Sequence, residues 1–384
     1  MGTLFAVYDW LDTQMGVRWL WPGELGTVVL RKSTLSCGPT CDVKGSSPFL
    51  HTRLRIGAYL GKKQMDLTRE EFDRFVYDTN VWLRRHRFGR VLDLNYPHAY
   101  EAYWRRFGTE HPEYFALRPD GQRAPVSEDT PHLVQMCVSS RGLHKQIITD
   151  WLRARRPDKP WINGAENDRT EKDPSCGCEA CRAWDAKDAE SRQRDAGFPR
   201  PLAGLHSDRY AKFWLALQAE ARKHDPDATV IGYAYSDYLL PPLETSLNDH
   251  IVVGIVPTSR FPLSQGGRDD FRNLWNGWAK TGARLYLRPN YFLQGYCLPF
   301  IFAKDFAEQF QFAWQHQMVA TDFDSLTGMW GVQGPNLYML GRIHERPDMA
   351  SDAILSEYYS GFGPAAGRCP QLLRVLGTGV STEG

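Results

Sequence analysis

The runs Thr229-Val-Ile-Gly-Tyr-Ala234 and Ile251-Val-Val-Gly-Ile-Val256 are short and apolar, and a polar, proline-containing segment separates them. A helical pattern stands before the first run, with apolar side chains spaced by about 3.6 residues at Tyr210, Phe213, Trp214, Leu217 and Ala221. Short apolar runs that alternate with helical patterns indicate βα units and a parallel sheet.

The same alternation extends over most of the chain. Helical stripes also lie over residues 72–83 and 302–314, and eight strands are predicted at residues 53–58, 91–94, 133–138, 161–164, 229–234, 251–256, 284–287 and 318–323. Eight such units suit a closed (β/α)8 TIM barrel, whereas a doubly wound sheet more often has about five to seven strands. The glycine patterns of nucleotide-binding loops do not occur, so we expect no organic cofactor.

The first 50 residues do not follow this alternation. Residues 4–15 have a helical pattern, residues 17–22 are predicted as a strand, and residues 31–52 have the composition of a linker. We expect residues 1–50 to be the C-terminal remnant of a small α/β domain with its linker, and residues 51–384 to form the catalytic (β/α)8 barrel.

Composition and charge argue against nucleic acid and membranes as partners. Lys and Arg number 46, Asp and Glu number 45, and no basic run stands out. The N-terminus lacks the basic segment of a signal peptide, and no run reaches the ~18 to 20 apolar residues of a membrane span. We expect a soluble chain, cytoplasmic as it stands, that binds a neutral or small partner.

Polar side chains gather where the predicted strands end. In a barrel these positions converge on one face, which carries the chemistry. Carboxylate, amide, aromatic and guanidinium groups in one place suit a carbohydrate substrate. The candidates are His98 after the second strand, Glu166, Asn167 and Asp168 after the fourth, Tyr235 and Asp237 after the fifth, Arg288 and Tyr291 after the seventh, and Asp322, Asp324 and Trp330 in or after the eighth.

Glu166 and Asp168 are the predicted catalytic residues. Glycoside cleavage needs one carboxyl held protonated as an acid and a second group that stabilises or attacks the oxocarbenium-like centre. Two close carboxylates repel each other, and this repulsion raises the pKa of one of them. The alternative is structural: Asp168 caps a following helix, and Glu166 pairs with Arg169 at the surface.

The remaining acids and the histidine also have two interpretations. Asp322 and Asp324 lie two residues apart on a strand, so their side chains point the same way. They either bind substrate or form a buried network with arginines, for which the candidates are Arg53, Arg55 and Arg288. Asp237 is alternatively a turn former, and His98 is alternatively the partner of a backbone carbonyl.

Three cysteines follow the strand-four residues in the tight run Cys176-Gly-Cys178-Glu-Ala-Cys181. This spacing suits metal ligation better than a framework of disulfides. Cys137, at the end of the predicted third strand, would complete four sulfur ligands, because strands three and four are neighbours in a barrel. We predict a structural zinc; the alternatives are reduced thiols or a local disulfide.

Several motifs resemble the bacterial family of domains of unknown function 4838. They are Gly2-Thr-Leu-Phe-Ala-Val-Tyr-Asp-Trp10, Gly16-Val-Arg-Trp-Leu-Trp-Pro-Gly-Glu-Leu-Gly26, His111-Pro-Glu-Tyr-Phe-Ala-Leu-Arg-Pro-Asp-Gly121, Asn167-Asp168 before the three cysteines, and Tyr358-Tyr-Ser-Gly-Phe-Gly-Pro-Ala-Ala366. That family is similar to barrel glycoside hydrolases preceded by a small α/β domain, as in family 20 hexosaminidases and family 67 α-glucuronidases. Residues 1–26 resemble only the end of that small domain.

The resemblance implies a class of reaction. In the hexosaminidases an adjacent Asp-Glu pair follows strand four and the substrate's acetamido group is the nucleophile; this chain has Glu166-Asn167-Asp168 instead. We expect an exo-acting glycoside hydrolase for a β-linked N-acetylhexosamine at the end of a polysaccharide or glycan. The alternatives are a uronic-acid-directed glycosidase of the α-glucuronidase type and a non-catalytic carbohydrate-binding barrel.

Overall fold

A computed structural model describes residues 2–29, 33–34, 47–56, 67–170, 172–188, 205–293, 300–326 and 330–371. Its centre is a parallel sheet of six strands: β3 (His51–Ile56), β4 (Ile162–Asn163), β5 (Val230–Ala234), β6 (Ile251–Ile255), β7 (Arg284–Leu287) and β8 (Met318–Leu326). Their order is β3-β8-β7-β6-β5-β4. The first of these strands therefore lies beside the last, as it does in a (β/α)8 barrel.

Within the described residues the sheet does not close into the predicted eight strands. Residues 91–94 and 133–138, the predicted second and third strands, form no strand, and that prediction was wrong; Met136 makes only an isolated bridge to Phe115. Their backbone groups bind other partners: the Cys137 N–H donates to the Tyr114 carbonyl, and the Leu94 N–H donates to Nδ1 of His51. The six other predicted strands are confirmed, with ends shifted by a few residues where residues are described.

The two faces of the sheet pack against different partners. The inner face is lined by a small apolar cluster that includes Ile231, Tyr233 and Tyr286. Leu94 and Tyr96 belong to the same cluster, so the segment of the predicted second strand lines the interior without pairing as a strand. A Cβ on Gly254 would lie 2.4 Å from the Tyr286 ring, and glycine at this position therefore makes room for the tyrosine inside the sheet.

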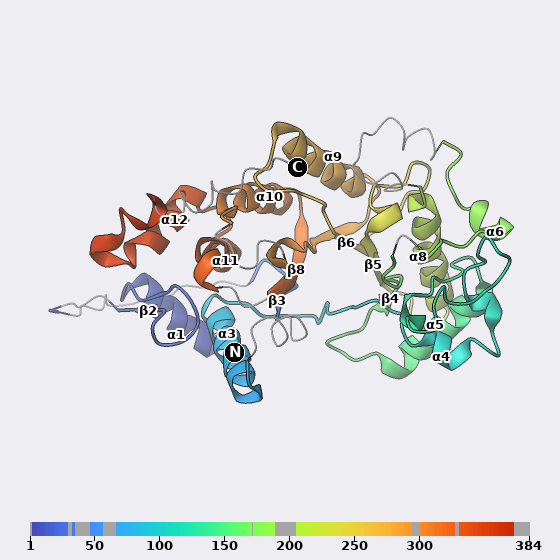
Figure 1. Ribbon diagram of the computed structural model, residues 1–384, viewed down its shortest axis with the longest axis horizontal. Coiled ribbons are helices and arrows are strands. Elements are labelled where there is room, and N and C mark those ends of the chain that lie inside the picture. The colour runs from blue at the N-terminus through green and yellow to red at the C-terminus, as the bar shows by residue number, and fades with distance from the viewer. Residues whose placement is uncertain are drawn as a thin grey trace.

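Helices surround the sheet, and some of them pack directly on its strands. The long ones are α3 (Arg69–Arg85), α5 (Arg141–Ala154), α8 (Ser207–Ala221), α9 (Gln265–Ala279), α10 (Ala303–Gln315) and α11 (Trp330–Glu345), and the shorter ones are α4 (Tyr103–Phe107), α6 (Glu179–Arg182) and α12 (Ser351–Ser360). Figure 1 shows α9 and α10 along one side of the strands. The predicted stripes at residues 72–83, 210–221 and 302–314 fall on α3, α8 and α10. No helix among the described residues is both long and apolar enough for a membrane span.

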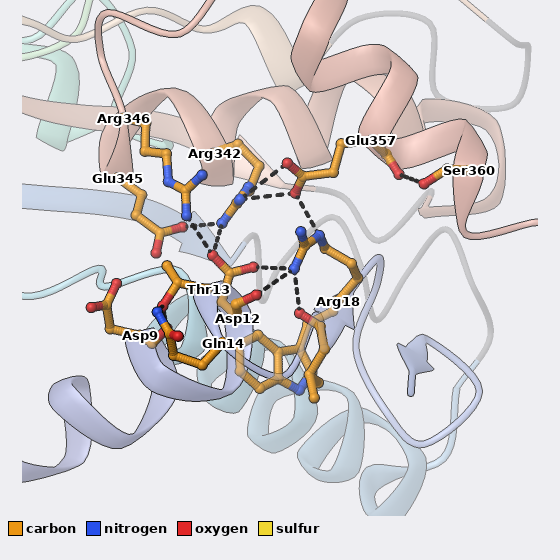
Figure 2. Close-up of polar contacts among 12 residues, drawn as sticks. Asp9, Asp12, Thr13, Gln14, Arg18, Arg342, Glu345, Arg346, Glu357 and Ser360 are labelled. Carbon is orange, nitrogen blue, oxygen red and sulfur yellow. Dashed lines mark hydrogen bonds and ion pairs between the residues drawn. The ribbon is translucent and has the colours of Figure 1, made fainter. Parts of the chain in front are cut away.

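The N-terminal segment packs on the C-terminal helices. Helix α1 (Gly2–Thr13) precedes a two-stranded antiparallel pair, β1 (Arg18–Trp19) and β2 (Thr27–Val28). Figure 2 shows the buried Asp12 carboxylate between Arg18 and Arg342, at 2.6 and 3.0 Å. Charges this deeply buried need such partners, so the network holds α1 against α11. Most of the predicted linker at residues 31–52 lies outside the described residues.

Candidate active site

The predicted site residues lie at the carboxyl ends of the strands. Because the six strands are parallel, these ends meet at one edge of the sheet, where sites form in α/β proteins. The loop after β4 supplies Glu166 and Asp168, and β8 supplies Asp322 and Asp324. Carboxylates therefore lie on β8 and just after β4, two strands that β7, β6 and β5 separate in the sheet.

Glu166 is enclosed by protein, with 1% of its surface exposed. Its Oε1 accepts the Asn167 N–H at 2.9 Å, and its Oε2 accepts the Met136 N–H at 3.3 Å and the Tyr210 hydroxyl at 3.1 Å. Burial raises the pKa of Glu166 to about 7, although the three hydrogen bonds oppose that rise. The Glu166 carboxyl therefore loses its proton as the pH rises through neutrality, while the protein stays folded.

The structural alternative for Glu166 and Asp168 does not hold. Arg169 pairs with Asp237, at 2.5 Å, and not with Glu166. Residues 169–178 form turns and irregular chain wherever they are described, so Asp168 caps no helix. Burial is the larger cause of the raised pKa of Glu166, and the negative charge of Asp237 adds to it. The expected repulsion thus comes from Asp237 and not from Asp168.

Asp168 is half-buried and faces the sheet edge. The Tyr235 hydroxyl and the Arg169 N–H both donate to its Oδ1, at 3.1 and 2.9 Å. The His98 ring lies 6.2 Å from that of Tyr235, and its Nδ1 contacts the Glu166 carbonyl at 2.5 Å. His98 thus contacts a backbone carbonyl, which was the alternative to substrate binding. It also lies beside Tyr235, which binds Asp168.

Asp322 and Asp324 differ in exposure although both side chains point inward. Asp322 is fully buried, and Arg55 binds it through Nε and Nη2 at 3.0 and 2.5 Å. Burial opposes its ionisation, but the hydrogen bonds and charge of Arg55 hold the pKa of Asp322 below its ordinary value. The Asp324 side chain is 30% exposed and pairs with Arg288 at 3.1 Å. Asp322 is enclosed by this arginine network, whereas Asp324, which Arg55 also approaches at 3.7 Å, lies at its partly exposed side.

A continuous row of side chains joins Asp168 to Asp324. The Tyr233 ring lies 6.0 Å from that of His98 on one side and 4.5 Å from the Arg288 guanidinium carbon on the other. We call this set the polar row; its members are Asp168, Tyr235, His98, Tyr233, Arg288 and Asp324. The row carries a partly exposed carboxylate at each end, whereas Tyr233 and Arg288 between them are buried.

Besides Glu166 and Asp322, four predicted residues lie outside the row or beneath it. Tyr291 is buried and donates to Gln309 at 2.5 Å, and Trp330 packs edge-on against Trp82 at 4.7 Å. Neither of these contacts is with a member of the row. Asn167 lies beneath it, because its amide accepts the Tyr100 N–H and donates to the Val134 carbonyl. Asp237 also supports the loop, through Arg169 and the Ser175 hydroxyl.

Tyr233 and Tyr210 were missed in the sequence analysis. Tyr233 stands on β5 two residues from Tyr235, and the alternation of a strand would have placed both on one side. Tyr210 was assigned to the helical stripe of α8, where nothing separates a core tyrosine from one that binds a buried carboxyl. Burial raises its pKa well above the ordinary value, so its hydroxyl stays a donor to Glu166.

The four predicted metal ligands also come together. The sulfurs of Cys137, Cys176, Cys178 and Cys181 all lie within 4.8 Å of one another. Cys137 comes from an irregular segment and not from the end of a strand, since the predicted third strand does not form. The segment that carries Cys137 nevertheless lies close to the loop after β4.

Residues 64–371 match the model of a family described as Domain of unknown function (DUF4838). No curated protein matches the chain. Among solved structures, the α-L-fucosidase isoenzyme 2 of Paenibacillus thiaminolyticus is 15% identical, with a TM-score of 0.34 over 62% of this chain and 35% of that one. A glycoside hydrolase family 20 β-N-acetylglucosaminidase is 12% identical, with a TM-score of 0.35 over 79% and 60%.

The Streptomyces plicatus N-acetyl-β-hexosaminidase, solved in complex with Thio-NAglucal, is 14% identical, with a TM-score of 0.32 over 77% of this chain and 54% of that one. The chain thus spans between 35% and 60% of the length of these three proteins. One fold hosts many unrelated activities, and the side chains of the site determine which activity a chain has.

Proposed function

This chain belongs to the DUF4838 family, as its sequence motifs predicted, and we propose that it is a glycoside hydrolase whose active site is the polar row. The observation that supports this proposal is the pair of partly exposed carboxylates, Asp168 and Asp324, at the two ends of a row of aromatic and basic side chains. A carboxyl group that can donate a proton, with charged groups that can bind the sugar, suits the cleavage of a glycosidic bond.

Asp168 is the catalytic carboxylate in this proposal. It is the partly exposed member of the Glu166–Asp168 pair, and the Tyr235 hydroxyl orients it through a hydrogen bond to Oδ1. Protonated Asp168 gives its proton to the glycosidic oxygen as the bond from C1 to that oxygen breaks, and the electron pair stays on the oxygen. Water then adds to C1, and the proton that it loses returns to the Asp168 carboxylate.

Glu166 acts as a positioning residue. Its carboxyl points into the protein toward Met136 and Tyr210, so it does not face the row. It instead fixes the backbone from which Asp168 projects, because the Asn167 N–H donates to it. Arg288 and Asp324 would bind sugar hydroxyls at the other end of the row, as charged groups with planar hydrogen-bonding geometry do.

For the sugar, the first candidate is a terminal β-linked N-acetylhexosamine, which rests on the resemblance of the sequence motifs. A second candidate is an acidic sugar. Two buried arginine nitrogens near the row, Nη1 of Arg53 and Nε of Arg288, have no hydrogen-bond partner among the described residues. A substrate carboxylate would give such groups a partner.

The test is a panel of chromogenic glycosides that includes N-acetyl-β-glucosaminide, N-acetyl-β-galactosaminide, α- and β-glucuronide and α-fucoside. Release from an N-acetylhexosaminide supports the first candidate, and release from a glucuronide supports the second. Sugar binding by calorimetry with no release from any glycoside would contradict the proposal and indicate a non-catalytic carbohydrate-binding barrel.

A further inference from the structure

We infer that Cys137, Cys176, Cys178 and Cys181 hold one structural zinc ion, which fixes the two segments that support Glu166 and Asp168. The four sulfurs come from two parts of the chain, one before α5 and one before and within α6. The inference does not depend on the proposed reaction, because it concerns a site that lies beside the polar row and not in it.

The spacing of the sulfurs fits a tetrahedral ion. Sγ of Cys137 lies 3.7 Å from that of Cys178 and 3.8 Å from that of Cys181. Zinc–sulfur bonds of about 2.3 Å give a tetrahedron whose edges are about 3.8 Å. A disulfide would need about 2.05 Å between two sulfurs, so these pairs are too far apart to be bonded. The arrangement therefore matches four ligands of one ion better than crosslinked cysteines.

The surroundings of the sulfurs are those of a closed site. Cys137, Cys176 and Cys181 are at most 4% exposed, and Cys178 is half-buried. Backbone N–H groups donate to sulfur twice, from Leu117 to Cys176 at 3.2 Å and from Cys181 to Cys178 at 3.4 Å. Such donors stabilise thiolates, and a closed site with four sulfur ligands is structural in kind.

Each segment that carries a ligand also contacts, one residue away from that ligand, a residue that supports the loop bearing Asp168. Met136, which precedes Cys137, donates its N–H to Glu166. Ser175, which precedes Cys176, accepts from Arg169 at 2.8 Å and donates to Asp237 at 2.7 Å. Binding of an ion by both segments would therefore hold the loop after β4 in place, since metal binding stabilises the conformation that provides the ligands.

The experiment measures metal on the intact, untagged chain by inductively coupled plasma mass spectrometry. The expected result is about one zinc per chain. Replacement of zinc by cobalt(II) should give visible bands of a tetrahedral ion together with sulfur-to-cobalt charge-transfer bands. Removal of the metal should also speed amide hydrogen exchange at Met136 and Asn167, a change that activity measurements cannot show.

Cys178→Ser is the informative variant because Cys178 is the most exposed of the four ligands, and Cys369→Ser is the matched control because Cys369 lies outside the cluster. Zinc content should fall about tenfold or more in the first and stay unchanged in the second. If Cys178→Ser does not fold, the wild-type zinc content and cobalt spectrum still decide. Wild-type protein with iron in place of zinc, with a disulfide among the four cysteines, or with four free thiols and no metal would overturn the inference.

Discussion

The Tyr235 hydroxyl donates a hydrogen bond to Oδ1 of Asp168 across 3.1 Å. This bond orients the carboxyl that we propose as the acid, so Tyr235→Phe should lower kcat about tenfold while the free energy of unfolding changes by about 1 kcal/mol or less. Tyr77→Phe is the control, since Tyr77 is 65% exposed on α3. Steady-state kinetics and urea unfolding give both quantities. Unchanged kcat in Tyr235→Phe would show that this bond does not orient a catalytic group.

Asp322 and Asp324 provide a matched pair of acids on one strand. Asp322→Asn leaves Arg55 without its buried carboxylate and should destabilise the fold by about 3 to 5 kcal/mol. Asp324→Asn removes a partly exposed acid and should lower the free energy of unfolding by about 1 kcal/mol or less, with a clear rise in KM. Urea unfolding separates the two variants. Equal destabilisation would contradict the division between a buried network and a ligand-binding end.

Stability should depend on pH through Glu166. Its pKa is about 7 in the folded chain against an ordinary value of 4.5, so the folded state favours the protonated form. The stability from this group is complete below pH 4.5 and is lost as pH rises through 7. Since Gln has no such proton, the stability of wild type relative to Glu166→Gln should fall between pH 5 and pH 8, by on the order of 3 kcal/mol at most.

Urea unfolding of both proteins at the two pH values measures that difference. Glu128→Gln serves as the control, because Glu128 is exposed and should leave the pH dependence of wild type unchanged. Parallel pH dependence of wild type and Glu166→Gln would mean that Glu166 is ionised in the folded chain throughout this range.

Asn167 is expected to support the loop. Its amide accepts from the Tyr100 N–H and donates to the Val134 carbonyl, and all of these groups are buried. Asn167→Ala leaves both backbone groups without a partner and should destabilise the fold by about 2 to 4 kcal/mol. The exposed Asn273→Ala on α9 should change stability little. Wild-type thermal and urea stability in Asn167→Ala would contradict this supporting role.

Much of the sheet could be predicted because buried parallel strands are continuous apolar runs. Their composition alone identifies them, without knowledge of the strands that they pair with. The runs at 229–234 and 251–256 became β5 and β6 for this reason. The runs at 91–94 and 133–138 misled because their backbone groups bind side chains and a neighbouring loop. The Asn167 amide and the Glu166 carboxyl occupy the Val134 carbonyl and the Met136 N–H. The periodicity of the sequence cannot predict such hydrogen bonds between side chains and the backbone.

The candidate site was predictable in part. Position after a strand identified Asp168 and Tyr235, which the structure joins by a hydrogen bond. Position did not identify burial, so Glu166 and Asp168 could not be told apart, and the partners of Tyr291 and Trp330 were not foreseen. The cysteines were the best defined group, because three of them are fixed close together by the chain itself.

A comparison of the wild-type chain with Asp168→Asn, on whichever chromogenic glycoside the panel identifies, tests the role of Asp168. Loss of the acid should lower kcat about 100-fold or more, while the free energy of unfolding stays within about 1 kcal/mol of wild type. The exposed Asp129→Asn should behave as wild type in both measurements. Turnover by Asp168→Asn at the wild-type rate would contradict the assignment of this carboxylate and, with it, of the polar row as the active site.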